Sequence, residues 1–102
     1  MKLLIVTTLR EFKNDVSAIL KKAGIQTFSF SETIGIKTSH VPNISDDWFT
    51  SDSNHEYRSV FFFSFTDEEK AQSVLKKLET FNTLERVDYP VHGFILPVEK
   101  AM

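Results

Sequence analysis

The side chains best suited to chemistry gather in one polar stretch, residues 40–56, with the sequence HVPNISDDWFTSDSNHE. Two histidines, His40 and His55, flank it, and its carboxylates are those of Asp46, Asp47, Asp52 and Glu56. Imidazole and carboxylate groups are both competent ligands for divalent cations, so one interpretation is a metal site. Because the spacing matches no compact ligand motif, we favour the other interpretation, a solvated polar loop that holds no metal.

The sequence carries no signature of catalysis. It contains no glycine-rich phosphate loop, no His-Glu-x-x-His motif and no Gly-x-Ser-x-Gly elbow. Arg10 follows the first predicted strand, but an anion loop of the acylphosphatase type would also need glycine there. Since the chain has no cysteine, thiolate nucleophiles, thiolate metal ligands and disulfides are excluded. We therefore predict a protein that is not an enzyme and has no resident cofactor.

The same stretch lies in a predicted loop of unusual length, residues 37–56. Loops without regular structure rarely exceed ~12–15 residues unless they are functional or disordered. Trp48 and Phe49 stand side by side at its centre. They either fold back onto the domain or bind another protein, a role for which tryptophan is favoured. Both interpretations remain open, and partner binding is the working hypothesis.

Composition predicts one compact domain, residues 1–102, and limits its partners. Ten phenylalanines supply large apolar areas for a core. The formal net charge is −2, and the lysines and arginines are spread along the chain, which argues against nucleic acid as a partner. No apolar run approaches the ~18 residues of a membrane span, and the N-terminal run is too short for a signal peptide. We expect a cytoplasmic protein.

The elements that must position these residues follow from hydrophobic periodicity. Alternating or β-branched runs predict strands over residues 3–8, 26–36, 57–65 and 91–96. A first helix starts at Asn14–Asp15 and ends before Gly24, and a second starts with a capping-box pattern at 66–69. The order predicts an α+β fold, a ferredoxin-like βαββαβ sandwich. It has an antiparallel sheet, two helices on one face and the long loop between the second and third strands.

Both faces of this sheet are predicted to be apolar, although two helices can cover only one. In the third strand Phe61, Phe63 and Phe65 point away from Val60 and Phe62. Soluble monomers rarely expose a large apolar patch. Either the C-terminal tail or the long loop covers the second face, or it faces another copy of the chain in a symmetric oligomer. We favour the oligomer.

Residues 9–37, LREFKNDVSAILKKAGIQTFSFSETIGIK, resemble the opening of the PII signalling family. The matching features are a Phe-Lys pair after the first strand, an Asp-Val helix start, a Gly-Ile helix end and a Ser-Glu pair leading to glycine. In this sequence they are Phe12-Lys13, Asp15-Val16, Gly24-Ile25, Ser31-Glu32 and Gly35. The long loop falls where that family has its flexible T-loop, and the rest of the chain follows the family's order of elements.

The resemblance implies a homotrimer that binds an adenine nucleotide or similar small effector in clefts between subunits. The effector then reshapes the T-loop-like segment, residues 37–56, which controls a partner protein; a membrane transporter is one candidate. Carried over by position, the effector residues at the loop base are Glu32, Gly35, Ile36 and Lys37. The family's glycine-rich second phosphate loop is replaced here by NTLERVDYP, residues 82–90, in which Arg86 is the only basic residue.

Two further hypotheses remain open at this point. The chain is also compatible with a trimeric divalent-cation tolerance protein of the CutA type, in which His40, His55 and the loop carboxylates would bind metal. A dimeric ferredoxin-like enzyme is the third hypothesis, for which the sequence shows no catalytic constellation.

Overall fold

The computed structural model describes residues 1–38, 54–85 and 89–102. The strands are β1 (Lys2–Leu9), β2 (Ser29–Thr38), β3 (Asn54–Thr66) and β4 (His92–Pro97). The helices are the 3-10 helix η1 (Arg10–Phe12) and the α-helices α1 (Lys13–Lys22) and α3 (Glu68–Glu85). None of the helices in the described ranges has the length and apolar character needed to cross a membrane.

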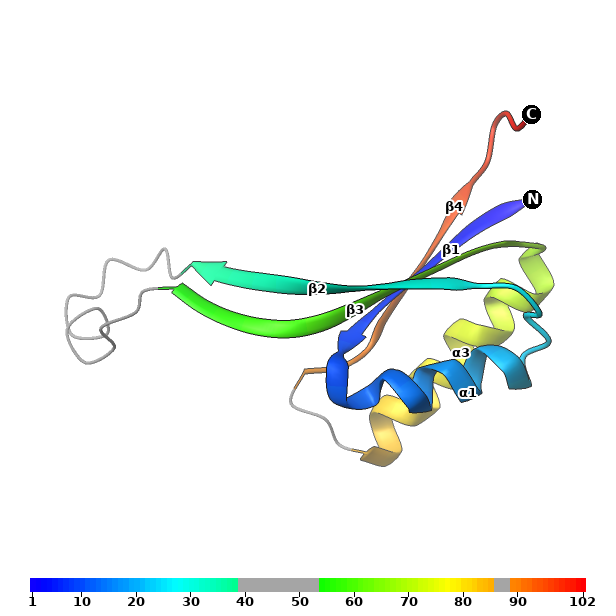
Figure 1. Ribbon diagram of the computed structural model, residues 1–102. Coiled ribbons are helices and arrows are strands. Elements are labelled where there is room, and N and C mark those ends of the chain that lie inside the picture. Colours follow the sequence, from blue (N-terminus) through cyan, green and yellow to red (C-terminus); the bar gives the residue numbers. More distant parts are fainter. Residues whose placement is uncertain (39–53, 86–88) are drawn as a thin grey trace.

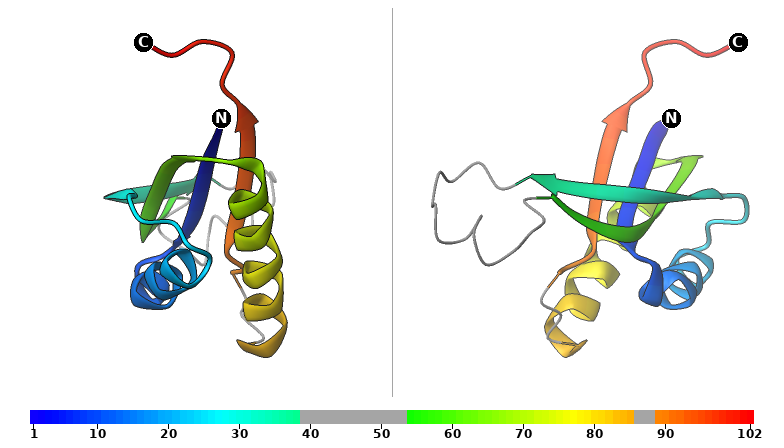
Figure 2. Two further views of the ribbon diagram at one scale, coloured as in Figure 1. Left: turned by 90° about the vertical axis from the view of Figure 1, so that its right-hand side faces the viewer. Right: turned by 60° about the vertical axis from the view of Figure 1, so that its left-hand side comes forward.

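The four strands form one antiparallel sheet in the order β2-β3-β1-β4. β3 lies between β1 and β2, which α1 connects, and β1 lies between β3 and β4, which α3 connects. Both α-helices pack on the same face of the sheet (Figures 1 and 2). This confirms the predicted ferredoxin-like βαββαβ sandwich.

The end of α1 follows the sequence prediction closely. Gly24 has a φ of 89°, a left-handed conformation that favours glycine. The Gly24 N–H donates to the Lys21 carbonyl and the Ile25 N–H to the Leu20 carbonyl, both at 3.0 Å, as in a Schellman motif. Ile25 then joins the core. The helix begins at Lys13, one residue before the predicted start, because η1 runs directly into it.

The start of α3 differs from the predicted capping box by one residue. The Asp67 carboxylate, not the Thr66 hydroxyl, caps the helix by accepting from the Lys70 N–H at 2.8 Å. Thr66 is the last residue of β3 and pairs with Lys2 of β1, so its backbone belongs to the sheet. The predicted apolar stripe is confirmed, with Ala71, Val74 and Leu78 buried and Leu75 and Phe81 partly buried.

The core lies between the helices and the face of the sheet that they cover. Its buried residues come from β1, β3, α1 and α3 and from the connections that precede β2 and β4: Leu4, Val6, Val16, Leu20, Ile25, Val60, Phe62, Ala71, Val74, Leu78 and Val91. Asn82 of α3 fixes the chain just before β4, because its side-chain amide both donates to and accepts from the Val91 backbone at 2.9 Å. These two bonds hold the end of the second crossover against the sheet.

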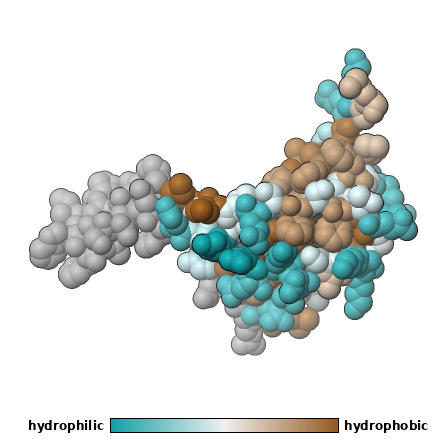
Figure 3. All heavy atoms as spheres, viewed as in Figure 1, coloured by the Kyte–Doolittle hydropathy of each residue, from teal (hydrophilic) through white to brown (hydrophobic). Residues whose placement is uncertain are grey.

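The opposite face of the sheet is apolar, as predicted, and in the described ranges no helix or strand lies over it. The register places on it Leu3, Ile5, Phe61, Phe63, Phe65, Phe94 and Leu96, which we call the open sheet face. Phe65 is 58% exposed and Phe94 51%. Figure 3 shows apolar side chains gathered over the sheet, on the side away from the helices.

The strand boundaries around the long connection differ from those predicted. β2 starts at Ser29 and not at residue 26. The β2–β3 pairing ends at Ser29 and Phe63, because the next residue of β3, Ser64, donates its hydroxyl to the Thr27 carbonyl at 2.7 Å. β2 and β3 also extend into the predicted loop 37–56, where Lys37 pairs with His55 and Thr38 with Asn54. In this part the strands are held by backbone pairing without an apolar alternation in the sequence, so the sequence pattern did not predict the extension. The remainder, 39–53, lies outside the described residues.

Candidate functional site

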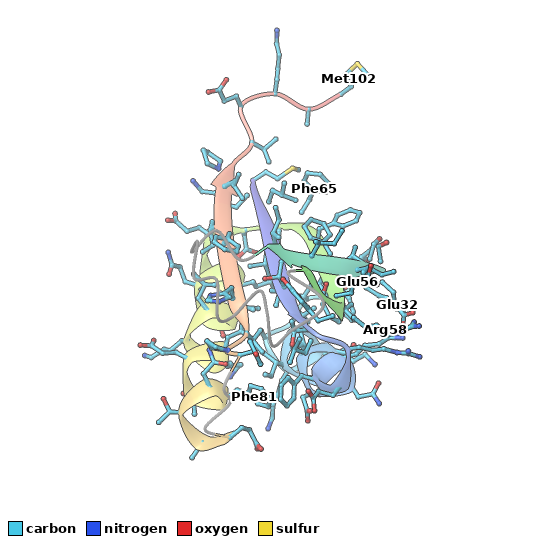
Figure 4. All side chains as sticks on the ribbon, turned by 90° about the vertical axis from the view of Figure 1, so that its left-hand side faces the viewer. Glu32, Glu56, Arg58, Phe65, Phe81 and Met102 are labelled. Atoms are coloured by element: carbon cyan, nitrogen blue, oxygen red, sulfur yellow. The ribbon has the colours of Figure 1, made fainter. Side chains whose placement is uncertain are left out.

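Beyond the region that the helices cover, β2 and β3 continue as a two-stranded ribbon (Figure 1). At the base of this ribbon Ile34 pairs with Arg58, Gly35 with Tyr57 and Ile36 with Glu56. Paired residues of antiparallel strands share a face, so Glu32, Ile34 and Arg58 lie on the helix side. Figure 4 shows Glu32 and Arg58 near each other on the side of the sheet where α1 lies, and Phe65 on the opposite side.

Two cationic side chains lie beside the Glu32 carboxylate at the ribbon base, and a third lines the same hollow. Glu32 Oε1 lies 3.7 Å from Arg10 Nε and 4.0 Å from Lys13 Nζ. Arg10 and Lys13 reach it because η1 turns the chain back immediately after β1. Lys13 Nζ also stands 4.1 Å from the centre of the Phe30 ring, a cation–π contact. The third cation, Arg58, lies on the neighbouring strand and forms no ion pair within the part of the chain that the structure describes.

These groups line a shallow hollow of about 230 Å³, which we call the hairpin-base hollow. Its lining residues are Arg10, Glu32, Thr33, Ile34, Arg58 and Ser59. The Thr33 and Ser59 hydroxyls are hydrogen-bonded to each other at 2.6 Å across the two strands. Two guanidinium groups against one carboxylate leave the lining with a net positive charge, in a chain whose formal net charge is −2. The hollow therefore suits an anion.

Gly35 has a clear packing role at the ribbon base. A Cβ built on Gly35 would stand 2.2 Å from Tyr57 Cζ and 2.4 Å from Tyr57 Cε2. The Tyr57 ring therefore lies directly over the Gly35 backbone, on the face opposite the helices. The position of Gly35, a predicted effector residue, is thus occupied closely in this structure by a side chain of the same protein.

The structure brings together only part of the predicted effector set. Glu32 lines the hollow, whereas Ile36 lies farther along β2 and is 63% exposed. Lys37 is placed only by its backbone pairing with His55. Arg86, and the predicted partner-binding residues Trp48 and Phe49, lie outside the described residues. Their assignments stay predictions.

The metal-site hypothesis also stays a prediction. His40 and the carboxylates of Asp46, Asp47 and Asp52 fall outside the described residues, and only the backbone of His55 is described. Among the side chains that the structure places, no three histidines or carboxylates stand close enough together to hold a metal ion.

Sequence reasoning did not predict that Arg10 and Arg58 line the same hollow. The sequence draws attention to Arg10 only as part of a possible anion loop, and to Arg58 only as one residue of a strand. The strand periodicity places Arg58 on the helix side, with Val60 and Phe62. The residue that pairs with Arg58 on β2, Ile34, is determined by the register of the two strands. That register depends on the strand boundaries, which the sequence did not predict correctly.

Comparison with known proteins identifies structures with a similar fold. The sequence matches no protein-family model and no curated protein. Among solved structures, it resembles a protein from Thermus thermophilus that is described as a putative PII-like signalling protein. That match has a TM-score of 0.62 and 15% identity and covers 92% of this chain and 82% of the other.

A second solved structure is similar over nearly the whole chain. It is CPII, a nitrogen regulatory PII-like protein from Thiomonas intermedia K12, bound to ADP, AMP and bicarbonate. The TM-score is 0.62 and the identity 18%, with 99% of this chain and 94% of the other covered. The chain therefore has the fold of the PII-like signalling proteins, which confirms the resemblance seen in residues 9–37 at the level of the fold.

Proposed function

We propose that this protein is a divergent PII-like regulator that binds a small anionic effector and controls a partner protein. The observation that carries the proposal is the positively charged hairpin-base hollow, located where the ribbon leaves the body of a PII-like fold. The effector class is an adenine nucleotide or a related anion, since CPII, of the same fold, is bound to ADP, AMP and bicarbonate. The proposed role is regulatory and non-enzymatic.

The proposal includes a homotrimer in the cytoplasm. The open sheet face supports self-association, because burying aromatic side chains such as Phe65 and Phe94 between copies removes a large apolar area from water. In a trimer, neighbouring subunits would complete the effector clefts. Glu32, Gly35, Ile36, Lys37 and Arg86 are the proposed effector residues, to which the lining of the hollow adds Arg10 and Arg58.

The controlled partner would contact the segment 37–56, with Trp48 and Phe49 as its apolar anchors. A membrane transporter is one candidate for that partner. An adjacent tryptophan and phenylalanine provide the large rigid side chains on which binding energy concentrates in protein interfaces.

A thermal-shift panel tests the effector class. The purified protein is heated with ATP, ADP, AMP, cyclic AMP, S-adenosylmethionine, bicarbonate, copper or zinc in separate samples. A ligand that binds only the folded state at about 100 times its Kd stabilises it by ~2.7 kcal/mol, a readily measured rise in Tm. We expect a rise with at least one adenine nucleotide. A rise with copper or zinc alone would contradict the proposal and favour the cation-tolerance hypothesis.

A further inference from the structure

The proposed function leaves open what binds the phosphate groups, because the chain lacks the glycine-rich second phosphate loop. Residues 82–90 contain no glycine. Backbone N–H groups in glycine-rich loops usually surround phosphate oxygens, so their absence calls for other donors. Guanidinium groups are the strongest substitutes, because each presents several N–H donors in a plane that matches two phosphate oxygens.

Arg10 and Arg58 provide two such groups from two different elements. Arg10 begins η1 and Arg58 lies on β3, and both line the hairpin-base hollow. Arg58 takes part in no ion pair in the described ranges, although Glu56 lies two residues away on the same face. Thr33 and Ser59 also line the hollow, but their hydroxyls, which are hydrogen-bonded to each other, lie on the face of the sheet opposite Glu32 and Arg58.

Glu32 is the anion already present at the hollow. Its carboxylate stands between Arg10 and Lys13 at 3.7 and 4.0 Å, distances at the long end of ion pairing. Both ends of these pairs are solvent-accessible, with side-chain exposures of 54% for Arg10 and 47% for Glu32. Exposed pairs of this kind are weak, so a phosphate with two or more charges competes with the carboxylate at little cost.

We propose that the hairpin-base hollow is a diphosphate-binding site in which Arg10 and Arg58 bind the phosphate oxygens and Glu32 is the carboxylate that the ligand displaces from Arg10. The inference rests on the proposed function and names the groups that recognise its effector. The shared chemistry is a diphosphate, carried by a nucleotide or free as inorganic pyrophosphate. This redefines the role of Glu32 among the proposed effector residues: it lies beside the ligand and competes with it for Arg10, so it sets the threshold of binding.

Isothermal titration of ADP, adenosine and inorganic pyrophosphate into five proteins tests this assignment. The proteins are the wild type, Arg10→Gln, Arg58→Gln, Glu32→Gln and the control Lys76→Gln. Lys76 is exposed on α3, so its replacement removes the same unit of charge away from the hollow. All four altered side chains lie at the surface, and thermal melts without ligand establish that each variant is folded.

We expect Arg10→Gln and Arg58→Gln each to weaken ADP and pyrophosphate binding by about tenfold or more, the effect of losing a charge-assisted hydrogen bond. The control should stay within about twofold of the wild type, since distant surface charges are screened by salt. Glu32→Gln should bind both ligands more tightly, by roughly threefold or more, because a neutral amide competes poorly for Arg10. Weakening by Glu32→Gln would refute the displacement.

The outcomes separate this inference from the function it refines. If the wild type binds ADP and both arginine variants bind it equally well, the diphosphate assignment is wrong and the effector proposal stands. If the wild type binds pyrophosphate but neither ADP nor any other nucleotide, the site stands and the nucleotide effector is wrong. If the wild type binds neither ADP nor pyrophosphate, the diphosphate site is refuted, whatever other effector the thermal-shift panel finds.

Discussion

Replacing Phe94 by alanine tests whether the open sheet face is the interface between subunits. Phe94 lies on β4 and is 51% exposed in the single chain. Its ring stacks on that of His92, with ring centroids 6.4 Å apart. If copies of the sheet face each other, the exposed half of this ring becomes buried, and truncating it removes that burial from every subunit.

The size of the effect follows from the exposed area. A phenylalanine side chain offers roughly 200 Å² for burial, so about 100 Å² remains to be covered in the assembly. At ~25 cal/mol per Å² this area stabilises the interface by about 2.5 kcal/mol per subunit, or about 7.5 kcal/mol for three subunits. Since 1.4 kcal/mol is a factor of ten, the trimer association constant falls by about five orders of magnitude.

Sedimentation velocity over a dilution series measures this change. The concentration at which half of the chains are assembled varies as the inverse square root of the trimer association constant, so it rises by more than about a hundredfold. Leu84→Ala is the matched control, because Leu84 is 75% exposed but lies on α3, in the helical layer. Far-ultraviolet circular dichroism establishes that the variants keep their secondary structure.

Two results would refute the reasoning. A wild-type protein that sediments as a monomer at every concentration would show that the open sheet face is not a self-association surface. A Phe94→Ala protein that assembles as tightly as the wild type, with an unchanged sedimentation coefficient, would show that the subunits meet through another surface.

Two substitutions test the packing of α3 against β4. Asn82→Ala removes both hydrogen bonds to the Val91 backbone and should lower the free energy of unfolding by about 1–3 kcal/mol. The control, Thr83→Ala on the exposed side of the same helix, should change it by less than ~0.5 kcal/mol. Equal urea midpoints for the two variants would contradict this expectation. Gly93→Ala places a Cβ 2.4 Å from Leu75 Cδ2 and should destabilise by about 1–3 kcal/mol through overpacking between α3 and β4. An unchanged urea midpoint would show that the Leu75 side chain moves aside at no cost.

The fold was predictable from the sequence because its signals are local and agree with one another. The Schellman motif at Gly24 and Ile25 depends on a short run of residues, and the alternation in β3 assigns Phe61 and Phe62 to opposite faces without knowledge of the partner strands. The helix cap was misplaced by one residue because Thr66 and Asp67 are both good caps. Only the β1–β3 ladder, which includes Thr66, decides between them.

The hollow was not predictable in the same way because its residues are distant in sequence and depend on register. Arg10 and Glu32 are joined by the turn of η1, and Arg58 stands opposite Ile34. A slip of one residue between β2 and β3 would move Arg58 to the open side of the sheet. Gly35 was predicted only as an effector residue, and the group that lies over it in the structure, the Tyr57 ring, comes from the paired strand.

The position of the hollow suggests how an effector would influence the proposed partner segment. Glu32 lies on β2 and Arg58 on β3, the two strands that bracket residues 39–53. A ligand shifts a conformational equilibrium only as far as its affinities for the two states differ. A diphosphate that binds Arg58 contacts β3 directly and affects β2 by releasing Glu32 from Arg10, so a change in the pairing of the two strands at the ribbon base alters its affinity. Linkage makes the effect reciprocal: a partner that favours one arrangement of the ribbon must change effector affinity by the same factor.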